Sequence, residues 1–152
     1  MKCKLLLIVI AIMGSGFSSK AQSQSTNYLL ASQLQIITEK IGLPVDSAAA
    51  FLKDFTKVEN TAPGQTVYKS NTDAVFISFE KDENGRTTII KVFMPKAMLS
   101  TAEKAIALMG MIASGTAAPP GYTAYATPKY AAFLNPALPN GVLSLVLVQG
   151  GK

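Results

Sequence analysis

Val75-Phe76-Ile77-Ser78-Phe79-Glu80 is followed, across Asn84-Gly85, by Thr88-Ile89-Ile90-Lys91-Val92-Phe93-Met94, and these two apolar runs decide the fold of the chain. Runs rich in Val, Ile and Phe are typical of β-strands. Asn-Gly is favoured in two-residue type I′ hairpin turns, because both central residues of that turn take positive φ angles. The sequence therefore predicts an antiparallel β-hairpin that turns at Asn84-Gly85.

The register of this hairpin follows by counting outward from the turn, with Glu83 opposite Arg86. One face collects three apolar pairs: Phe79 with Ile90, Ile77 with Val92 and Val75 with Met94. The other face is mixed, and its pairs are Ser78 with Lys91, Glu80 with Ile89 and Phe76 with Phe93. A slip by one residue would move every apolar side chain to the opposite face, so the coincidence of apolar pairs supports this register.

Helical periodicity precedes the hairpin. Between about Thr26 and Ile41, apolar residues recur at helical spacing and form one face: Leu30, Leu34, Ile37 and Ile41. A second helix is expected from Asp46 or Ser47 to about Val58, and the short link before it predicts a helical hairpin. Residues 65–69 are expected to add a strand beside the β-hairpin.

Two more helices are predicted after the hairpin. Ser100-Thr101-Ala102-Glu103 has the pattern of a capping box. It predicts an Ala-rich helix that runs to about Ala113 and ends before Gly115. Thr127-Pro128 predicts the start of a short helix through Phe133, because proline suits the first helical position.

A C-terminal strand is expected over 142–148, after a turn at Asn140-Gly141. It is apolar on both faces, which is typical of an interior strand sandwiched between layers. The predicted order is a helical hairpin, an antiparallel β-meander, an Ala-rich helix and this strand. That order favours an α+β fold, a two-layer domain. No internal repeat is evident and no long linker divides the chain, so residues 22–152 are predicted to form a single domain.

The N-terminus has the pattern of a secretory signal peptide. Lys2 and Lys4 precede an unbroken apolar run from Leu5 to Met13, and Ser19-Lys20-Ala21 offers small residues for cleavage. An uncleaved anchor fits less well, because a membrane-spanning helix needs roughly 20 apolar residues. We therefore expect residues 1–21 to be removed. The mature chain would then be periplasmic or extracellular and would not be an integral membrane protein.

The charge of the mature chain argues against nucleic-acid binding. Loss of the three lysines Lys2, Lys4 and Lys20 with the leader would lower the formal net charge from +5 to +2. That charge is too small to indicate a nucleic acid or an anionic membrane surface as a partner. The only cysteine, Cys3, lies in the leader, so the mature domain must be stable without disulfides.

Missing residue types limit the chemistry further. The chain has no histidine, which excludes Ser-His-Asp triads and histidine-based zinc sites. The hairpin tip resembles the first half of a calcium loop: Glu80, Asp82, Asn84 and Gly85. The twelfth position of that pattern is Lys91 instead of a bidentate glutamate. Carboxylate, lysine and tyrosine chemistry and oxygen-ligated cations remain open. Because the acidic residues show no paired motif, we predict no catalytic residues, no metal site and no cofactor.

Five aromatic residues are the candidate contact residues. Tyr122, Tyr125 and Tyr130 lie in or beside a Pro/Gly-rich stretch, where tyrosines either contact a partner or pack the loop onto the sheet. Phe76 and Phe93 share the face opposite the main core. If no helix covers that face they form an exposed contact surface, and if a second layer covers it they belong to the core.

By elimination, the leading hypothesis is an exported, non-catalytic module that binds a protein or a small apolar ligand. One alternative is a carboxylate-dependent hydrolase, which two acidic side chains converging in a cleft would support. Another is a self-assembling structural protein of the envelope, which an exposed edge on the C-terminal strand would favour. The sequence leaves the oligomeric state open.

Overall fold

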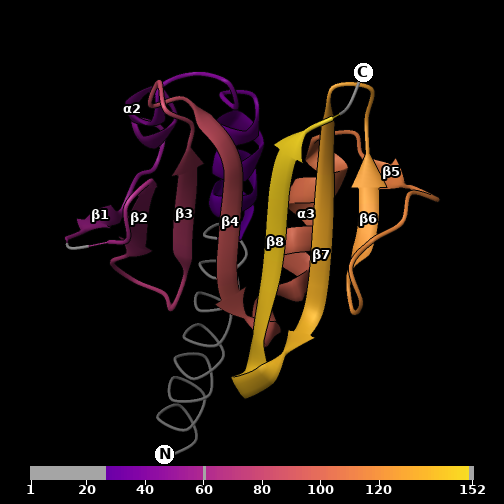
Figure 1. The fold of residues 1–152 in the computed structure, drawn as a ribbon. Helices are drawn as coiled ribbons and strands as arrows, with labels where there is room; N and C mark the ends of the chain where they lie inside the picture. Colours follow the sequence, from indigo (N-terminus) through magenta and orange to yellow (C-terminus); the bar gives the residue numbers. More distant parts are fainter. Residues whose placement is uncertain (1–26, 60, 151–152) are drawn as a thin grey trace, which may run out of the picture.

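The computed structural model describes residues 27–59 and 61–150 of the chain. The leader predicted over residues 1–21 lies outside these described residues. Within them, the chain has an α+β fold in which eight antiparallel strands form one sheet and the helices lie against one of its faces (Figure 1).

The helices are short compared with the sheet. Helix α1 covers 27–38 of the described residues, α2 is Val45–Ala49 and α3 is Leu99–Leu108, with single 3₁₀ turns at Lys96–Met98 and Pro139–Gly141. The strands are β1 Phe55–Val58, β2 Gln65–Ser70, β3 Phe76–Lys81, β4 Thr87–Pro95, β5 Ile112–Ala113, β6 Thr123–Ala126, β7 Tyr130–Leu138 and β8 Val142–Gln149. Their order across the sheet is β1-β2-β3-β4-β8-β7-β6-β5.

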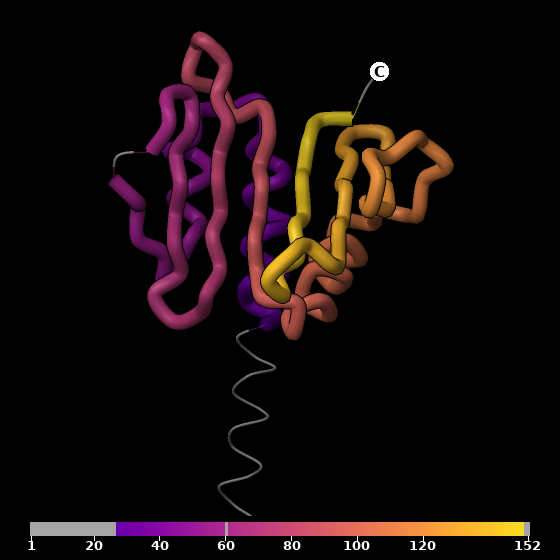
Figure 2. The backbone as a smooth tube through the Cα atoms, turned by 60° about the horizontal axis from the view of Figure 1, so that its bottom comes forward, coloured from indigo at the N-terminus to yellow at the C-terminus, as the bar shows by residue number. Residues whose placement is uncertain are grey.

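The strand order shows a repeat that the sequence does not. In each half of the chain, helical structure is followed by a four-stranded antiparallel meander: α1 and α2 precede β1 to β4, and α3 precedes β5 to β8. Figure 2 shows the two halves side by side. They join through β4 and β8, which pair antiparallel along seven residue pairs from Ile89↔Val148 to Pro95↔Val142.

The core lies between the helices and one face of the sheet. The predicted face of α1 is confirmed, since Leu30, Leu34, Ile37 and the following Ile41 are all buried. They pack with buried residues of α3 and with every second residue of the central strands. The sheet contributes Ile77, Phe79, Ile90, Val92, Leu143, Leu145 and Leu147, each fully buried.

The hairpin register predicted from the sequence is confirmed from Phe76 to Glu80, whereas Val75 lies before β3 and the turn is different. Phe79 pairs with Ile90, as predicted. In the turn, however, Gly85 N–H donates to the Asp82 carbonyl at 3.0 Å, and only Gly85, at φ 74°, is left-handed. This three-residue turn with a left-handed glycine shifts the pairing by one residue, and a bulge between Glu80 and Lys81 restores it.

The Asp82 side chain holds this turn together, so we expect Asp82→Ala to destabilise the domain. Its Oδ1 atom accepts the backbone N–H of Asn84 at 2.9 Å and of Arg86 at 2.8 Å. Loss of both exposed bonds should lower the free energy of unfolding by about 1 kcal/mol, measured by urea denaturation. Glu83→Ala is the control, because Glu83 is exposed in the same turn and removal of its side chain leaves both Asp82 bonds in place. Equal stability of the two variants would contradict this role.

The second predicted helix is wrong over most of its length. Helix α2 ends at Ala49, and the chain then turns through Asp54, whose φ is 60°. Residues 55–58 form the edge strand β1, because their backbone groups pair with β2. Phe51 and Phe55 would share one face of the predicted helix, but Phe51 lies outside α2 and is 40% exposed. Residues 65–70 do form the expected strand.

The capping box is also wrong. Helix α3 begins at Leu99, after a 3₁₀ turn, and no side chain caps its first turn. Ser100 is exposed, whereas Thr101 is buried inside the helix. The helix ends at Leu108 because Gly110 takes a left-handed conformation at φ 67°.

The short helix predicted through Phe133 is instead the start of β7. Thr127 Oγ1 accepts the backbone N–H of Lys129 and of Tyr130, which forms a turn into the strand rather than a helix cap. The strand then pairs with β6 on one side and β8 on the other, so long-range pairing overrides the local signal.

The C-terminal strand β8 is interior, as predicted, because β4 and β7 flank it. Within residues 27–59 and 61–150 it is not sandwiched between layers, since the described helices cover only one face of the sheet (Figure 1). We call the other side the open face.

Candidate functional site

The register places three rows of side chains across the open face. The first row runs Lys69, Phe76, Phe93, Ser144 and Asn135 from β2 to β7. The second runs Val67, Ser78, Lys91, Val146, Phe133 and Ala124. The third runs Gln65, Glu80, Ile89, Val148, Ala131, Ala126 and Ile112. Polar residues therefore dominate on the β2–β3 side, and apolar residues dominate from β4 to β5.

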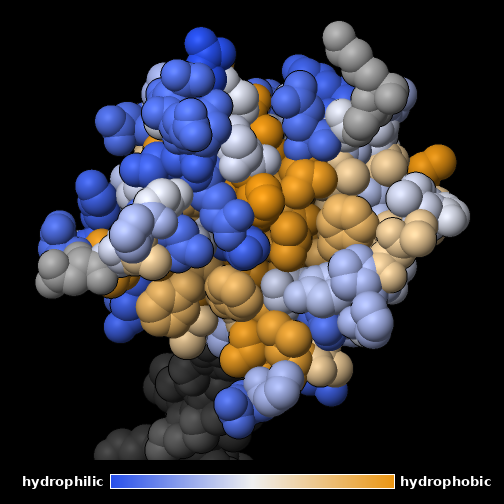
Figure 3. Space-filling view, in the orientation of Figure 1, coloured by the Kyte–Doolittle hydropathy of each residue, from blue (hydrophilic) through white to orange (hydrophobic). Residues whose placement is uncertain are grey.

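Six large apolar side chains of these rows form what we call the apolar patch: Phe76, Ile89, Phe93, Phe133, Val146 and Val148. Phe76 is 37% exposed, and the other five are partly exposed. Figure 3 looks onto this face and shows hydrophobic side chains gathered over the middle of the sheet, with hydrophilic ones around them. A contiguous apolar surface with a polar border is typical of an interaction site.

The charges within the open face are largely neutralised. Lys91 Nζ forms an ion pair with Glu80, and both side chains are partly exposed. Lys69 Nζ lies 5.9 Å from the centre of the Phe76 ring, within range of a cation–π contact. The Glu80–Lys91 pair thus reaches into the patch, with Lys91 between Ile89 and Phe93 on β4, and Lys69 lies at its border beside Phe76.

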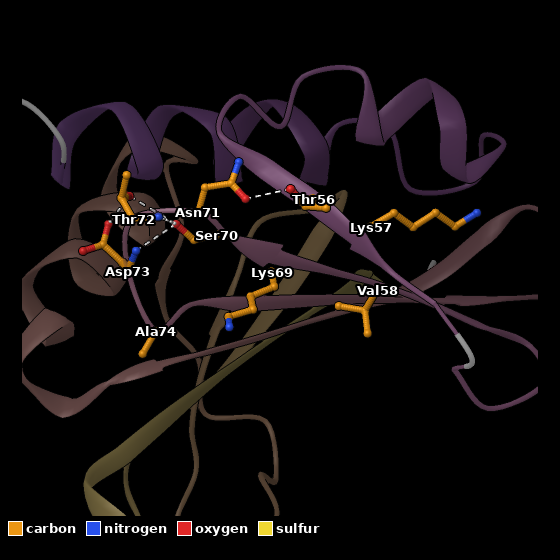
Figure 4. A pocket seen from close by; sticks show the side chains of 9 residues that line it. All are labelled: Thr56, Lys57, Val58, Lys69, Ser70, Asn71, Thr72, Asp73 and Ala74. Atoms are coloured by element: carbon orange, nitrogen blue, oxygen red, sulfur yellow. Dashed lines mark hydrogen bonds between the residues drawn. The ribbon is translucent and has the colours of Figure 1, made fainter.

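A polar hollow of about 560 Å³ adjoins the patch at the β1 side of the sheet. Figure 4 shows its lining along β1, the end of β2 and the turn that leads to β3. Thr56 Oγ1 donates to Asn71 Oδ1 at 2.7 Å, and Ser70 Oγ accepts the N–H groups of Thr72 and Asp73. The Thr56, Ser70 and Asn71 side chains of this wall are thus already engaged in hydrogen bonds within it.

A smaller hollow of about 40 Å³ lies on the other side of the same turn, against α1. Gln33 lines it, is 6% exposed, and its Nε2 finds no partner among the described residues. The volume suits about one or two waters. Asp54 and Asp73 both line this hollow, together with Lys53. No group of three or more His, Cys, Asp or Glu side chains that could hold a metal occurs in residues 27–59 and 61–150.

The structure separates the five predicted contact residues. Phe76 and Phe93 pair directly across β3 and β4 on the open face. Tyr122 is partly exposed in the loop before β6, whereas Tyr125 packs against the core from the helical side. Tyr130 is buried, and its hydroxyl donates to the Glu39 carbonyl at 3.4 Å.

A neighbouring lysine interacts with Tyr130. Lys129 Nζ lies 5.0 Å from the centre of the Tyr130 ring. Side-chain hydrogen bonding with Tyr130 is the main cause that raises the pKa of Lys129. These contacts anchor the start of β7 and leave little of the Tyr130 ring for a partner.

Sequence reasoning missed four members of the apolar patch: Ile89, Phe133, Val146 and Val148. The available signal was that 142–148 is apolar on both faces, which indicates that something covers both sides. That signal was interpreted as a covering layer within the domain, and the described residues provide no such layer.

Comparison with protein-family models, curated proteins and solved structures finds no match to this chain. Among the helices described, none has the length and apolar character needed to cross a membrane.

Proposed function

We propose that this chain is an exported, non-catalytic interaction module that docks a protein on the open face of its sheet. The apolar patch is the observation that carries the proposal. It presents six large apolar side chains on a rigid, eight-stranded support, and such patches on soluble domains mark protein contacts.

The shape of the face favours a protein over a small apolar ligand. Small-molecule sites are concave and bury most of the ligand. The hollow of about 560 Å³ that adjoins the patch is lined mainly by polar residues such as Lys57, Asn71 and Asp73. A protein surface suits the open face better, because its area can match three rows of side chains.

Two of the predicted aromatic residues belong to the proposed surface. Phe76 and Phe93 lie in its first row, and a partly exposed aromatic pair contributes much contact area with few rotatable bonds. Tyr125 and Tyr130 are omitted from it because they pack on the helical side.

The two alternative functions have less support. Edge-to-edge assembly through the C-terminal strand requires a free edge, and β8 is paired on both sides. For a hydrolase, the small hollow holds Asp54 and Asp73, but Lys53 shares it and its volume of about 40 Å³ is too small for a sugar ring.

Affinity capture tests the proposal. Residues 22–152 are immobilised and exposed to the envelope and secreted fractions of the native host, and retained proteins are identified by mass spectrometry. We expect Val146→Glu to reduce retention of a partner about 30-fold or more, because a carboxylate beside Lys91 must lose its water at the centre of an otherwise apolar contact.

Leu29→Glu is the matched control, because Leu29 is 45% exposed on α1, which lies against the opposite face of the sheet. It should retain the partner as well as the unchanged chain does. Circular dichroism must show that both variants are folded. A partner that binds the Val146→Glu variant undiminished would exclude the open face as its docking surface.

A further inference from the structure

We infer that the apolar patch docks a second copy of this chain, so that two open faces pack together about a two-fold axis. This inference rests on the proposed function, because it takes the open face to be a protein-docking surface and names the partner. Two properties of the face support it, its extent and its charge.

The extent of the face is adequate for a dimer. Neighbouring strands lie about 4.8 Å apart and alternate residues of one strand about 6.8 Å apart. The patch and its border, from β3 to β6, therefore cover roughly 25 Å by 20 Å on each copy. Two copies would bury on the order of 1,000 to 1,400 Å² in total, which reaches the lower range of specific interfaces.

The charge of the face permits self-association. A face with a net charge is repelled by its own copy, whereas a neutral one is not. Glu80 and Lys91 neutralise each other within one chain, so neither needs a charge from a partner. Lys69 lies at the edge of the rows, outside the apolar centre, and contacts Phe76 of its own chain.

Sheet-on-sheet packing provides the geometry. Two sheets pack about 10 Å apart when apolar side chains of their facing sides interdigitate. Val146 lies in the middle row on the central strand β8. A two-fold axis that crosses the strands near this residue would place Val146 against the partner's Val146. A single substitution at Val146 would then change both sides of the same contact, one from each copy.

Charge complementation between two variants tests this inference. Sedimentation analysis of residues 22–152 from about 1 µM to about 1 mM should show a mass that rises from one chain to two. Val146→Glu and Val146→Lys should each raise the dimer dissociation constant about 100-fold or more, since each places two like charges together. An equimolar mixture of these two variants should regain the dimer. Leu29→Glu should dimerise like the unchanged chain.

The outcomes separate this inference from the proposed function. If the unchanged chain stays monomeric, while capture retains a different protein that is lost with Val146→Glu, the second-copy inference is overturned and the docking surface stands. If it stays monomeric and captures nothing, both fail. A dimer that persists in Val146→Glu would place self-association elsewhere on the chain. A mixture that does not restore the dimer would show that the two Val146 side chains do not meet at the axis. Either result would overturn the inference.

Discussion

Phe79→Ala is expected to lower the free energy of unfolding by about 3 to 5 kcal/mol, as large-to-small changes of buried aromatic residues do. Phe79 is fully buried and pairs with Ile90 in the centre of the sheet. Its ring also makes an edge-to-face contact with Tyr68, with 5.8 Å between ring centres. The substitution would leave a cavity that the surrounding strands cannot close. Urea denaturation followed by far-UV circular dichroism measures the change.

Phe76→Ala is the matched control for Phe79→Ala. The two phenylalanines lie three residues apart in β3 and project to opposite faces of the sheet. Because Phe76 is 37% exposed, its truncation should cost only about 1 to 2 kcal/mol. The same variant should weaken docking on the open face. Similar losses of stability for both variants would contradict the assignment of one face as core and the other as open.

The hairpin was predictable because its pairing depends on local pattern. Apolar residues alternate in both strands, and only one register brings Phe79 to Ile90 and Ile77 to Val92. The burial of these apolar pairs determines the strand register more strongly than the turn sequence does. The turn formed differently from the Asn-Gly prediction, and a bulge after Glu80 adjusted the pairing so that the apolar side chains still meet on one face.

The missed strands depend on partners that are distant in sequence. Residues 55–58 and the start of β7 carry weak helical signals, and both are extended because a neighbouring strand offers backbone hydrogen bonds. For β7, Ala131 and Ala132 provide almost no strand preference, and the pairing with β8 decides the conformation. Local secondary-structure propensity carries no information about pairing between strands that are distant in sequence.

Whether the open face is covered could also not be predicted from the local sequence pattern. The sequence correctly indicates that Phe76 and Phe93 share a face. Whether that face is covered depends on how much helical structure the domain can place on it. A long second helix over 46–58 was expected, and only Val45–Ala49 is helical. The described helices therefore cover one face only, and they leave the apolar residues of β8 on the other face uncovered.

The proposed export of the chain yields the second large prediction. Val9→Arg should reduce the amount of protein outside the cytoplasm about tenfold or more, because Val9 lies at the centre of the apolar run Leu5–Met13. Arginine at the centre of an inserted apolar helix costs roughly 2.5 to 3.5 kcal/mol on insertion scales. Cell fractionation of a Gram-negative host and mass spectrometry of the chain measure both location and cleavage.

Val9→Leu is the control, since it keeps the run apolar and should be exported like the unchanged chain. The exported form should begin at Gln22, and the Val9→Arg chain should accumulate with residues 1–21 still attached. Normal export of Val9→Arg, or an exported chain that retains residues 1–21, would overturn the signal-peptide prediction. The result also bears on the open face, because a chain retained in the cytoplasm would meet a different set of proteins. The partner search then has to use the compartment in which the mature chain is found.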